Sequence, residues 1–385
     1  MVFLSRRLQR KDGNNGMFDI KSMTLDELQS LMLANGFEKF RGTQIYGWLL
    51  KSAGSFSEMI NLPGNLRDFL EKNCYICKLI IEKKLVSKSD NAVDKKDSGA
   101  DTKDLQFYSP PVCRPDGASC VKYLFKLRDG QFIESVVMRY HHGYTICVST
   151  QSGCKMNCAF CATGKGGFLR NLTASEMLAQ IESSQKDLNL RISNVVLMGM
   201  GEPLDNFDNV LRFLHLVSAE KGLHIGMRHI SLSTCGLVPQ IYKLAEHKLG
   251  LTLSVSLHAS NDGIRSKIIP VNKKYNISSL IKSCDYYTKK TGRRISFEYA
   301  MIKNVNDTLS CAKELAKLLK NRLCHVNLIP VNEVAGINFK KSDKKNLKMF
   351  VDVLSRENIT ATVRRTLGSD INASCGQLRA KSSDS

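Results

Sequence analysis

Features that mark exported and membrane-spanning proteins are missing from this chain of 385 residues. No apolar run reaches the length of about 18 residues that a membrane-spanning helix needs. The first 16 residues are basic but lack the apolar stretch of a secretory signal, so we expect none. We expect residues 1–16 to form a mobile basic arm. A short organelle transit peptide is the weaker alternative, and Met17 is a second candidate for the start.

Acidic residues and tryptophan are both scarce. The chain has 36 Asp and Glu against 56 Lys and Arg, a net charge of +20, and a single Trp. An excess of this size favours RNA or DNA as partner, because neutralised phosphates release counterions, although a basic protein without such a partner is the alternative. One Trp gives no evident stacking platform for single strands. Thirteen cysteines without an export signal indicate free thiols in a reducing compartment, so we expect a cytoplasmic protein with no membrane partner.

The first third of the chain predicts a small helical module and a linker. Thr24 and Glu27 have capping-box spacing before an apolar helical face, and further helices are expected over 42–51 and 66–73. We assign residues 17–85 to this module, as an RNA-docking attachment or a packing cap. Cys74 and Cys77 form a lone CxxC, which favours buried thiols over a metal site. Residues 86–120 are polar and low in apolar residues, which is typical of a solvated linker.

The remaining chain, 121–380, predicts an α/β core, with a short tail at 381–385. Two strands flank a turn at 128–130, and after Tyr144 strands and helices alternate. The expected strands are 121–126, 132–138, 145–149, 194–197, 229–233, 251–256, 295–300, 326–329 and 360–365. Six successive βα units imply parallel strands and favour a partial (β/α)6 barrel. A doubly wound sheet fits less well, because no GxGxxG follows the first strand.

Three thiols in one glycine-flanked loop predict an iron–sulfur cluster. Cys154, Cys158 and Cys161 are spaced C-x3-C-x2-C, and short spacings let one loop wrap a cluster. Three thiolates leave one iron of a 4Fe-4S cubane open to a small molecule. Zinc is the main metal alternative, but structural zinc sites use four Cys or His ligands, and no His lies between Cys147 and Cys161.

Polar groups recur where the expected parallel strands end, which is where βα barrels carry their chemistry. These groups are Gly201, Glu202, Ser233, Ser256, His258 and Asn332. Each has an ordinary structural role open to it when taken alone. Together at one mouth with the cysteine loop, they predict a cofactor pocket.

The cysteine spacing, with Phe160 before the last Cys, resembles the radical S-adenosylmethionine superfamily. Five ordered segments narrow the resemblance to the RlmN/Cfr family of RNA adenine methyltransferases. They are 146–154, 160–164, 198–203, 254–258 and 370–378. The match covers about residues 120–380, and the helical module fits that family's N-terminal domain. The arm 1–16 and the long linker depart from the family pattern outside these segments.

The resemblance implies a two-stage radical mechanism that uses two S-adenosylmethionine molecules per turnover. Cys154, Cys158 and Cys161 would bind the 4Fe-4S cluster. Cys375 would accept a methyl group, lose a hydrogen atom to a 5′-deoxyadenosyl radical and add to adenine. Glu134 would take the ring proton, and Cys147 would release the product by a transient disulfide with Cys375. The residues implied for S-adenosylmethionine are Gly201, Glu202, Ser233, Ser256, Leu257, His258 and Asn332. The cysteines without a role in that pattern, which we interpret as structural, are Cys235, Cys284, Cys311 and Cys324.

The resemblance also implies the substrates: an adenosine of 23S rRNA and the adenosine 3′ of the tRNA anticodon, methylated at C2. Glu202-Pro203 favours C2 over the C8 chemistry of Cfr-type enzymes, and a non-catalytic iron–sulfur RNA-binding or redox protein is the alternative of another class. We expect a monomer supplied by a one-electron reductant of flavodoxin or ferredoxin type. Candidates for phosphate contact are Lys340, Lys341, Lys344, Lys345, Arg364 and Arg365.

Overall fold

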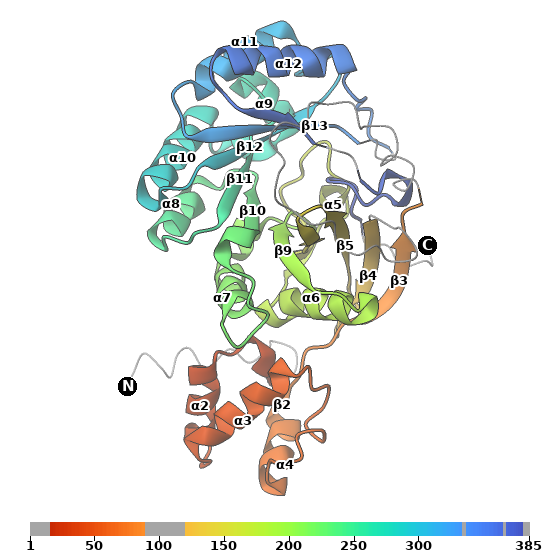
Figure 1. Cartoon of the computed structure of the whole chain (residues 1–385), viewed down its shortest axis with the longest axis vertical. Helices are drawn as coiled ribbons and strands as arrows, with labels where there is room; N and C mark the ends of the chain where they lie inside the picture. Colours follow the sequence, from red (N-terminus) through yellow and green to blue (C-terminus); the bar gives the residue numbers. More distant parts are fainter. Residues whose placement is uncertain (1–15, 89–119, 333–335, 365–366, 380–385) are drawn as a thin grey trace.

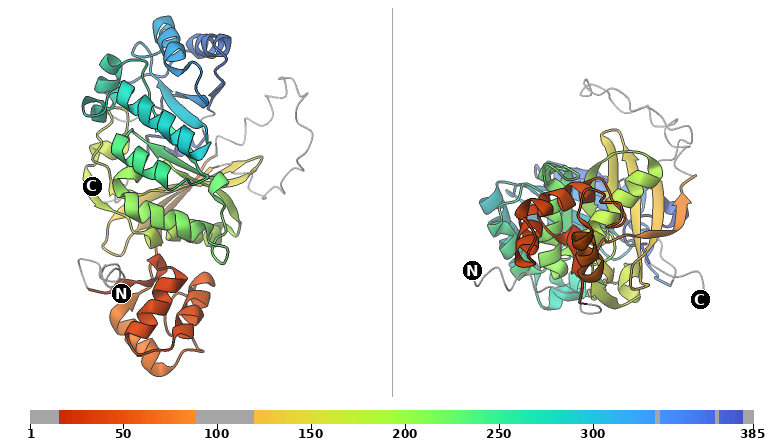
Figure 2. Two further views of the ribbon diagram at one scale, coloured as in Figure 1. Left: turned by 90° about the vertical axis from the view of Figure 1, so that its left-hand side faces the viewer. Right: turned by 90° about the horizontal axis from the view of Figure 1, so that it is seen from below.

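A computed structural model of the chain describes residues 16–88, 120–332, 336–364 and 367–379. A small helical module lies at one end of the molecule, against a larger α/β barrel (Figures 1 and 2). No helix in these ranges is long and apolar enough to cross a membrane. The expected arm 1–16 and tail 381–385 lie outside the described residues, except for Gly16.

The helical module contains the three helices that the sequence predicts. They are α2 (Leu25–Ala34), α3 (Lys39–Leu50) and α4 (Gly64–Asn73). Thr24 and Glu27 form both hydrogen bonds of the capping box that opens α2. Helices α2 and α3 cross closely at Gly42, where a Cβ would lie 2.6 Å from the backbone nitrogen of Gln29. The module has its own apolar core, and Cys74 is a buried free thiol in it.

Polar contacts attach this module to the barrel. Its chain begins with β1 (Phe18–Asp19), which pairs with β2 (Cys74–Tyr75), and η1 (Ile20–Ser22). From η1, Lys21 forms an ion pair with Glu182, and Ser22 Oγ accepts from Ser175 N at 2.9 Å. Glu27 of α2 pairs with Arg212. The module is therefore fixed against two barrel helices, which carry Ser175, Glu182 and Arg212.

A ten-stranded open sheet forms the barrel. Its spatial order is β14-β13-β12-β11-β10-β9-β6-β5-β4-β3. The antiparallel part comprises β3 (Ile80–Val86), β4 (Cys120–Lys126), β5 (Phe132–Tyr140) and β6 (Gly143–Cys147). The parallel part continues from β6 through β9 (Ile192–Leu197), β10 (Ile230–Thr234), β11 (Thr252–Ser256), β12 (Ile295–Met301), β13 (Cys324–Pro330) and β14 (Ala361–Val363). The parallel strands follow one another in sequence order without a reversal, which confirms a partial barrel rather than a doubly wound sheet.

Strand β3 corrects the expected organisation of the first third of the chain. We placed residues 80–85 in the helical module and Val86 in the linker, but Ile80–Val86 pairs with β4 as the outermost strand of the barrel sheet. Most of its residues are exposed, so it lacks the alternating pattern that marks a half-buried strand. Cys120, which we also placed in the linker, belongs to β4, and residues 89–119 lie outside the described residues.

Helices cover the outer face of the parallel strands (Figure 1). They are α6 (Ala174–Leu188), α7 (Phe207–Ser218), α8 (Val238–Glu246), α10 (Ile277–Thr291), α11 (Leu309–Leu319) and α12 (Lys344–Arg356). The short helix α9 (Asp262–Ile268) ends against the cysteine loop instead, where Ala159 N donates to Ile268 O at 2.8 Å. Thr173 and Glu176 form the predicted capping box of α6. Short 3₁₀ turns at Pro203–Asn206, Met227–His229, Pro270–Lys273 and Ser369–Ile371 complete the connections. The apolar faces of helices and strands form one continuous core, which fixes the strand ends at one mouth.

The cysteine loop is held by a hairpin that the sequence did not predict. Strand β7 (Gln151–Gly153) pairs with β8 (Phe168–Asn171), and the short helix α5 (Ala162–Lys165) lies between them. Gly153 has a φ of +78°, and a Cβ there would lie 2.0 Å from the carbonyl oxygen of Gly167. Only glycine fits this closure, so the loop starts at a fixed position.

Candidate active site

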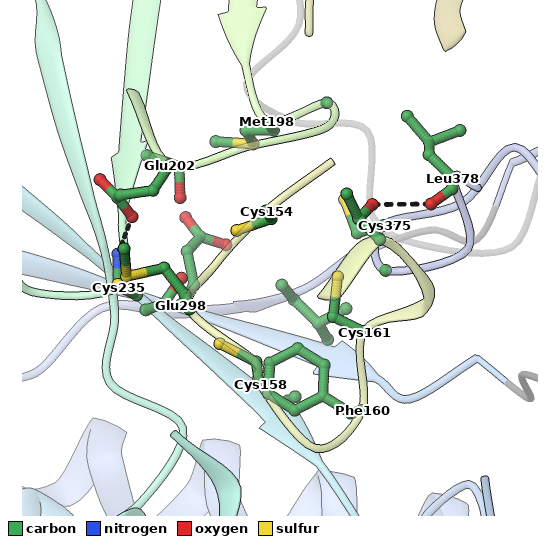
Figure 3. A pocket seen from close by; sticks show the side chains of 18 of the residues that line it. Cys154, Cys158, Phe160, Cys161, Met198, Glu202, Cys235, Glu298, Cys375 and Leu378 are labelled. Atoms are coloured by element: carbon green, nitrogen blue, oxygen red, sulfur yellow. Dashed lines mark hydrogen bonds between the residues drawn. The ribbon is translucent and has the colours of Figure 1, made fainter. Parts of the chain in front are cut away.

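A cavity of about 160 Å³ lies at the mouth of the barrel and collects most of the residues singled out from the sequence. Of the cysteine-loop and strand-end residues, those that line it are Cys154, Cys158, Cys161, Gly201, Glu202, Ser233, Ser256, His258 and Asn332. Figure 3 shows the thiols of Cys154, Cys158 and Cys161 turned toward this space. The expectation that polar strand ends and the cysteine loop share one pocket is therefore correct.

The three loop thiols fit a cluster better than a single metal ion. Within the described residues, no group of three or more Cys, His, Asp or Glu converges so as to hold one ion. A cubane places each thiolate on a different iron, so its ligands stand further apart than those of one zinc ion. Burial raises the pKa of Cys154 to about 12 and also raises the pKa of Cys158. Buried thiols of this kind become stable thiolates when a cation binds them, as iron would.

Glu202 presents a buried carboxylate in the loop after β9, directly before the 3₁₀ turn Pro203–Asn206. Its Oε1 accepts from Leu204 N at 3.0 Å and its Oε2 from Cys235 N at 2.8 Å. Burial raises its pKa, and these two backbone donors act in the opposite direction. Gly201 before it has a φ of +102°, and a Cβ there would lie 2.6 Å from Gln151 Cβ. The carboxylate is thus fixed in orientation and can receive the ammonium group of a ligand.

His258 is a neutral imidazole held in one tautomer. Its Nδ1 accepts from Ala300 N at 2.9 Å, so the ring proton lies on Nε2. Burial and the nearby guanidinium of Arg265 lower its pKa to about 3. Its ring packs edge-on against Phe160 of the cysteine loop, with centroids 4.9 Å apart. His258 can therefore donate to a ligand but adds no positive charge to the pocket.

Leu257, by contrast, does not line the cavity. Its side chain is fully buried in the core between Ser256 and His258. Its backbone N–H donates to Glu298 O at 3.1 Å, and its carbonyl accepts from Arg265 Nε at 3.1 Å. It positions its two neighbours, and any contact with a ligand would have to come through the backbone.

The two remaining cysteines meet in a smaller cavity of about 30 Å³ that adjoins the first. Cys147 at the end of β6 and Cys375 in the C-terminal segment both line it. Cys375 also lines the larger cavity, where Asn332 Nδ2 donates to its carbonyl at 3.4 Å. Cys375 therefore shares one cavity with the loop thiols (Figure 3) and the other with Cys147.

Glu134 is not in either cavity. It is buried on β5, with Lys122 Nζ 2.8 Å from its Oε1 and Arg379 N donating to its Oε2 at 2.7 Å. The C-terminal segment separates it from the larger cavity, since Leu378 lines that cavity and Arg379 covers the carboxylate. The structure thus places Glu134 next to the site, behind the segment that carries Cys375.

Three cavity residues were missed or misjudged from the sequence. Arg364, expected only as a candidate for phosphate contact, lines both cavities. Glu298 of β12 is buried in the cavity wall, where Ser296 Oγ donates to its Oε1 at 3.0 Å and Asn327 Nδ2 to its Oε2 at 2.8 Å. Cys235, which we interpreted as structural, lies beside Glu202 in the lining (Figure 3). Glu298 is a charged residue in a mostly apolar strand, and this was the signal for it in the sequence.

The other expected phosphate contacts have mixed outcomes. The four lysines of this set are exposed: Lys340, Lys341, Lys344 and Lys345. Arg365 lies outside the described residues. The exposed lysines remain candidates for contact with a polyanion.

Known families match both parts of the chain. The Radical SAM superfamily matches residues 148–319, and the ribosomal RNA large subunit methyltransferase N-terminal domain matches residues 18–76. A relative from Alkaliphilus oremlandii, named "Probable dual-specificity RNA methyltransferase RlmN", is 49% identical over 94% of this chain and 98% of its own length. A protein of the same name from Clostridium tetani is 46% identical over 95% of this chain and 97% of its own length. The chain belongs to the RlmN family of radical S-adenosylmethionine RNA methyltransferases.

A solved structure agrees with this assignment. The crystal structure of a radical SAM methyltransferase from Sphaerobacter thermophilus superposes with a TM-score of 0.83 at 38% identity, and covers 94% of this chain and all of its own. RlmN family membership confirms the radical-SAM barrel, the transferase class and the helical N-terminal domain. Membership of this family implies a 4Fe-4S cluster and not zinc. The alternative of a non-catalytic iron–sulfur RNA-binding or redox protein is wrong.

Proposed function

We propose that this RlmN-family enzyme methylates C2 of adenosine in 23S rRNA and of the adenosine 3′ of the tRNA anticodon. The relatives' shared name supports two RNA substrates for them, and the basic charge of +20 suits a polyanion. The observation that carries the proposal is the position of Cys375. This thiol lies between the three loop cysteines and Cys147, where a methyl acceptor of this chemistry has to be.

Cys154, Cys158 and Cys161 would hold the 4Fe-4S cluster by three thiolates. When bound, the cluster supplies one electron that cleaves S-adenosylmethionine to methionine and a 5′-deoxyadenosyl radical. Glu202 would receive the ammonium group of S-adenosylmethionine, and His258 would donate from Nε2. Ser233, Ser256 and Asn332 would add hydroxyl and amide contacts, with Gly201 and Leu257 contributing backbone.

Cys375 would act twice in one turnover. Its thiolate would attack the methyl carbon of a first S-adenosylmethionine, so that the sulfonium–methyl bond breaks and S-adenosylhomocysteine leaves. The S-methyl group then loses a hydrogen atom to the 5′-deoxyadenosyl radical, and the methylene radical adds to adenine C2. A radical is needed because this sp² carbon is not nucleophilic.

Glu134 and Cys147 would release the product. The adduct radical would lose one electron, which can return to the oxidised cluster, and its C2 proton would pass to the Glu134 carboxylate. Cys147 then attacks the sulfur of Cys375, which forms a disulfide and leaves the methylene carbon on the base to be protonated to methyl. A dithiol reductant must restore the two cysteines, and a flavodoxin- or ferredoxin-type donor must supply the starting electron. We also propose that the enzyme is a monomer and acts in the cytoplasm.

C2 is preferred over C8 as the target atom. The motif carries Glu202-Pro203, and the relatives described above are RlmN proteins. The target base has to leave its stack to reach Cys375 at the barrel mouth.

Anaerobic reconstitution tests the proposal. The protein is loaded with iron and sulfide, reduced, and incubated with S-adenosylmethionine and with 23S rRNA or tRNA transcripts. We expect 5′-deoxyadenosine and 2-methyladenosine. The 2-methyladenosine should be absent from a matched reaction with Cys375→Ala. Formation of 8-methyladenosine would reject C2 as target, and absence of 5′-deoxyadenosine with both RNAs would reject the radical reaction.

A further inference from the structure

Lys122 is a buried lysine to which the proposed reaction gives no role. It lies on β4 with 7% of its surface exposed. Its Nζ is 2.8 Å from Glu134 Oε1 and donates to the carbonyl oxygen of Asn372 at 3.0 Å. A buried ammonium group is tolerated where it is paired and hydrogen-bonded. Both contacts of Lys122 go to parts of the chain that the proposed reaction uses. One points to the proposed base, and the other to the chain three residues before Cys375.

The segment 367–379, which we name the strap, carries Cys375 and is attached on both sides of it. On the N-terminal side, Asn372 is held by Lys122. On the C-terminal side, Arg379 N donates to Glu134 Oε2 at 2.7 Å. The Lys122–Glu134 ion pair therefore contacts the strap at two points that flank the methyl-accepting cysteine.

Further anchors fix the strap near Cys375 without involving this ion pair. Ala162 N donates to Gly376 O at 2.7 Å, and Thr163 Oγ1 donates to Leu378 O at 2.6 Å. These contacts come from helix α5, next to the cysteine loop. They would keep the strap on the barrel when the contacts to Lys122 and Glu134 weaken.

We propose that Lys122 is a positioning residue that ties the base Glu134 to the strap, so that proton transfer to Glu134 loosens Cys375. This inference rests on the proposed role of Glu134. When the carboxylate takes the C2 proton it becomes a neutral acid. The ion pair then loses its charge–charge attraction, and Arg379 N faces a weaker acceptor.

Loosening at this moment serves the next step. Disulfide formation needs Cβ atoms about 3.5–4.5 Å apart with a restricted dihedral angle. Cys147 is fixed on β6, so any adjustment toward this geometry falls to Cys375 on the strap. A strap released by the proton transfer would let Cys375 reach that geometry after the adenine adduct has lost its C2 proton and not before.

Hydrogen exchange tests the tie without any chemistry. We compare the protein with Lys122→Met, Lys122→Arg and Glu134→Gln, the last as a neutral copy of the protonated base. Amides of 372–379 should exchange at least about tenfold faster in Lys122→Met and Glu134→Gln, and near the unsubstituted rate in Lys122→Arg. Lys84→Met is the matched control, because Lys84 on the adjacent strand pairs with Asp187 and does not contact the strap. Unchanged exchange of 372–379 in both neutralising variants would overturn the proposal.

The reaction provides a second readout. Loss of a lysine that only stabilises the fold would change methylation of Cys375 and resolution of the RNA adduct alike. In Lys122→Met the strap is already released, so methylation of Cys375 should stay within about threefold of the unsubstituted rate, while the covalent RNA adduct should resolve at least about tenfold faster. Lys122→Arg should keep resolution near the unsubstituted rate. Unchanged or slower resolution in Lys122→Met would overturn the proposal. If Lys122→Met fails to fold, the exchange of Glu134→Gln against Lys122→Arg decides. If the unsubstituted enzyme forms no methylated adenosine, the proposed function fails, whereas the exchange result still accepts or rejects the tie.

Discussion

Cys147 and Cys375 line one small cavity although 228 positions separate them, the first fixed on β6 and the second on the strap. Both are free thiols in the structure. Cys375 also reaches the larger cavity, and Cys147 does not. The two thiols therefore have different access, with Cys375 open to the cofactor side and Cys147 behind it. This asymmetry suits a methyl acceptor and a resolving thiol.

Replacing the resolving thiol should trap RNA on the protein. In Cys147→Ser, the methylene bridge can form but no disulfide can release it, so a covalent adduct between Cys375 and adenosine should accumulate. Product formation should fall by at least about a hundredfold, since the step then lacks its nucleophile. Denaturing gel mobility and mass spectrometry of nuclease-treated protein would detect the adduct. Cys284→Ser is the control, because Cys284 is buried on α10 outside both cavities. Normal turnover of Cys147→Ser would remove Cys147 from the mechanism.

The reactivity of Cys147 should rise steeply with pH. Burial, and to a lesser degree the nearby Cys375, raises its pKa to about 12, and Arg364 acts in the opposite direction. Since the thiolate is the reactive form, its fraction grows about tenfold per pH unit while the pH stays below the pKa. The labelling rate of Cys147 by iodoacetamide, followed by peptide mass spectrometry, should therefore increase about tenfold from pH 7 to 8 and again from 8 to 9. A plateau below about pH 9 would contradict the raised pKa.

Arg364 offers a matched test of the same electrostatics. It lines the cavity that holds both thiols, and its guanidinium lowers the pKa of Cys147. Arg364→Met should slow the labelling of Cys147 at a fixed pH by about threefold to tenfold, because the remaining environment disfavours the thiolate more strongly. Arg364→Lys keeps a cation and should lie between the two. Faster labelling in Arg364→Met would show that access, and not charge, controls the rate.

Loss of one loop cysteine should abolish the cluster. Cys158 lines the larger cavity with Cys154 and Cys161, and a cubane held by two thiolates loses a whole iron ligand. In Cys158→Ala, iron bound after reconstitution should fall by at least about tenfold, and the brown absorbance should disappear. Cys235→Ala is an informative comparison, because Cys235 lines the same cavity but lies outside the loop. We expect it to retain the cluster; a cluster retained by Cys158→Ala would refute the ligand assignment.

The local signals in the sequence located most elements, and contacts between distant segments account for what was missed. Capping boxes at Thr24 and Thr173 are confirmed because both bonds of each lie within four residues. Strand β3 was missed because an exposed edge strand has no burial pattern to read. The cover over Glu134 depends on Arg379, 245 positions away, and no local spacing encodes that contact.

The cavity residues show the same difference between local sequence signals and contacts made by distant segments. The strand-end rule placed Glu202, His258 and Asn332 correctly, because parallel strands align their carboxyl ends by topology alone. The sequence did not place Arg364 in the cavity, because it immediately follows the short strand β14 and only the packing of the strap shows which way it faces. Leu257 matched the family motif but points into the core, since alternate residues at the end of β11 face opposite sides.

His258 should make the protein less stable in mild acid. Its pKa is lowered from 6.5 to about 3 by burial and by Arg265, so the unfolded chain binds a proton that the folded chain does not. The stability it contributes is present above pH 6.5 and is lost as the pH falls from 6.5 toward about 3. Between about pH 7 and pH 5 the loss is about 2 kcal/mol. Urea unfolding of the cluster-free protein across this range would measure it. His258→Asn is the matched variant, because an Asn side-chain oxygen can still accept from Ala300 N and Asn tolerates the positive φ of +53°. This variant should lose stability at every pH but show a slope flatter by about one proton; an unchanged slope would mean that His258 binds its proton equally in the folded and unfolded protein, which would contradict the lowered pKa.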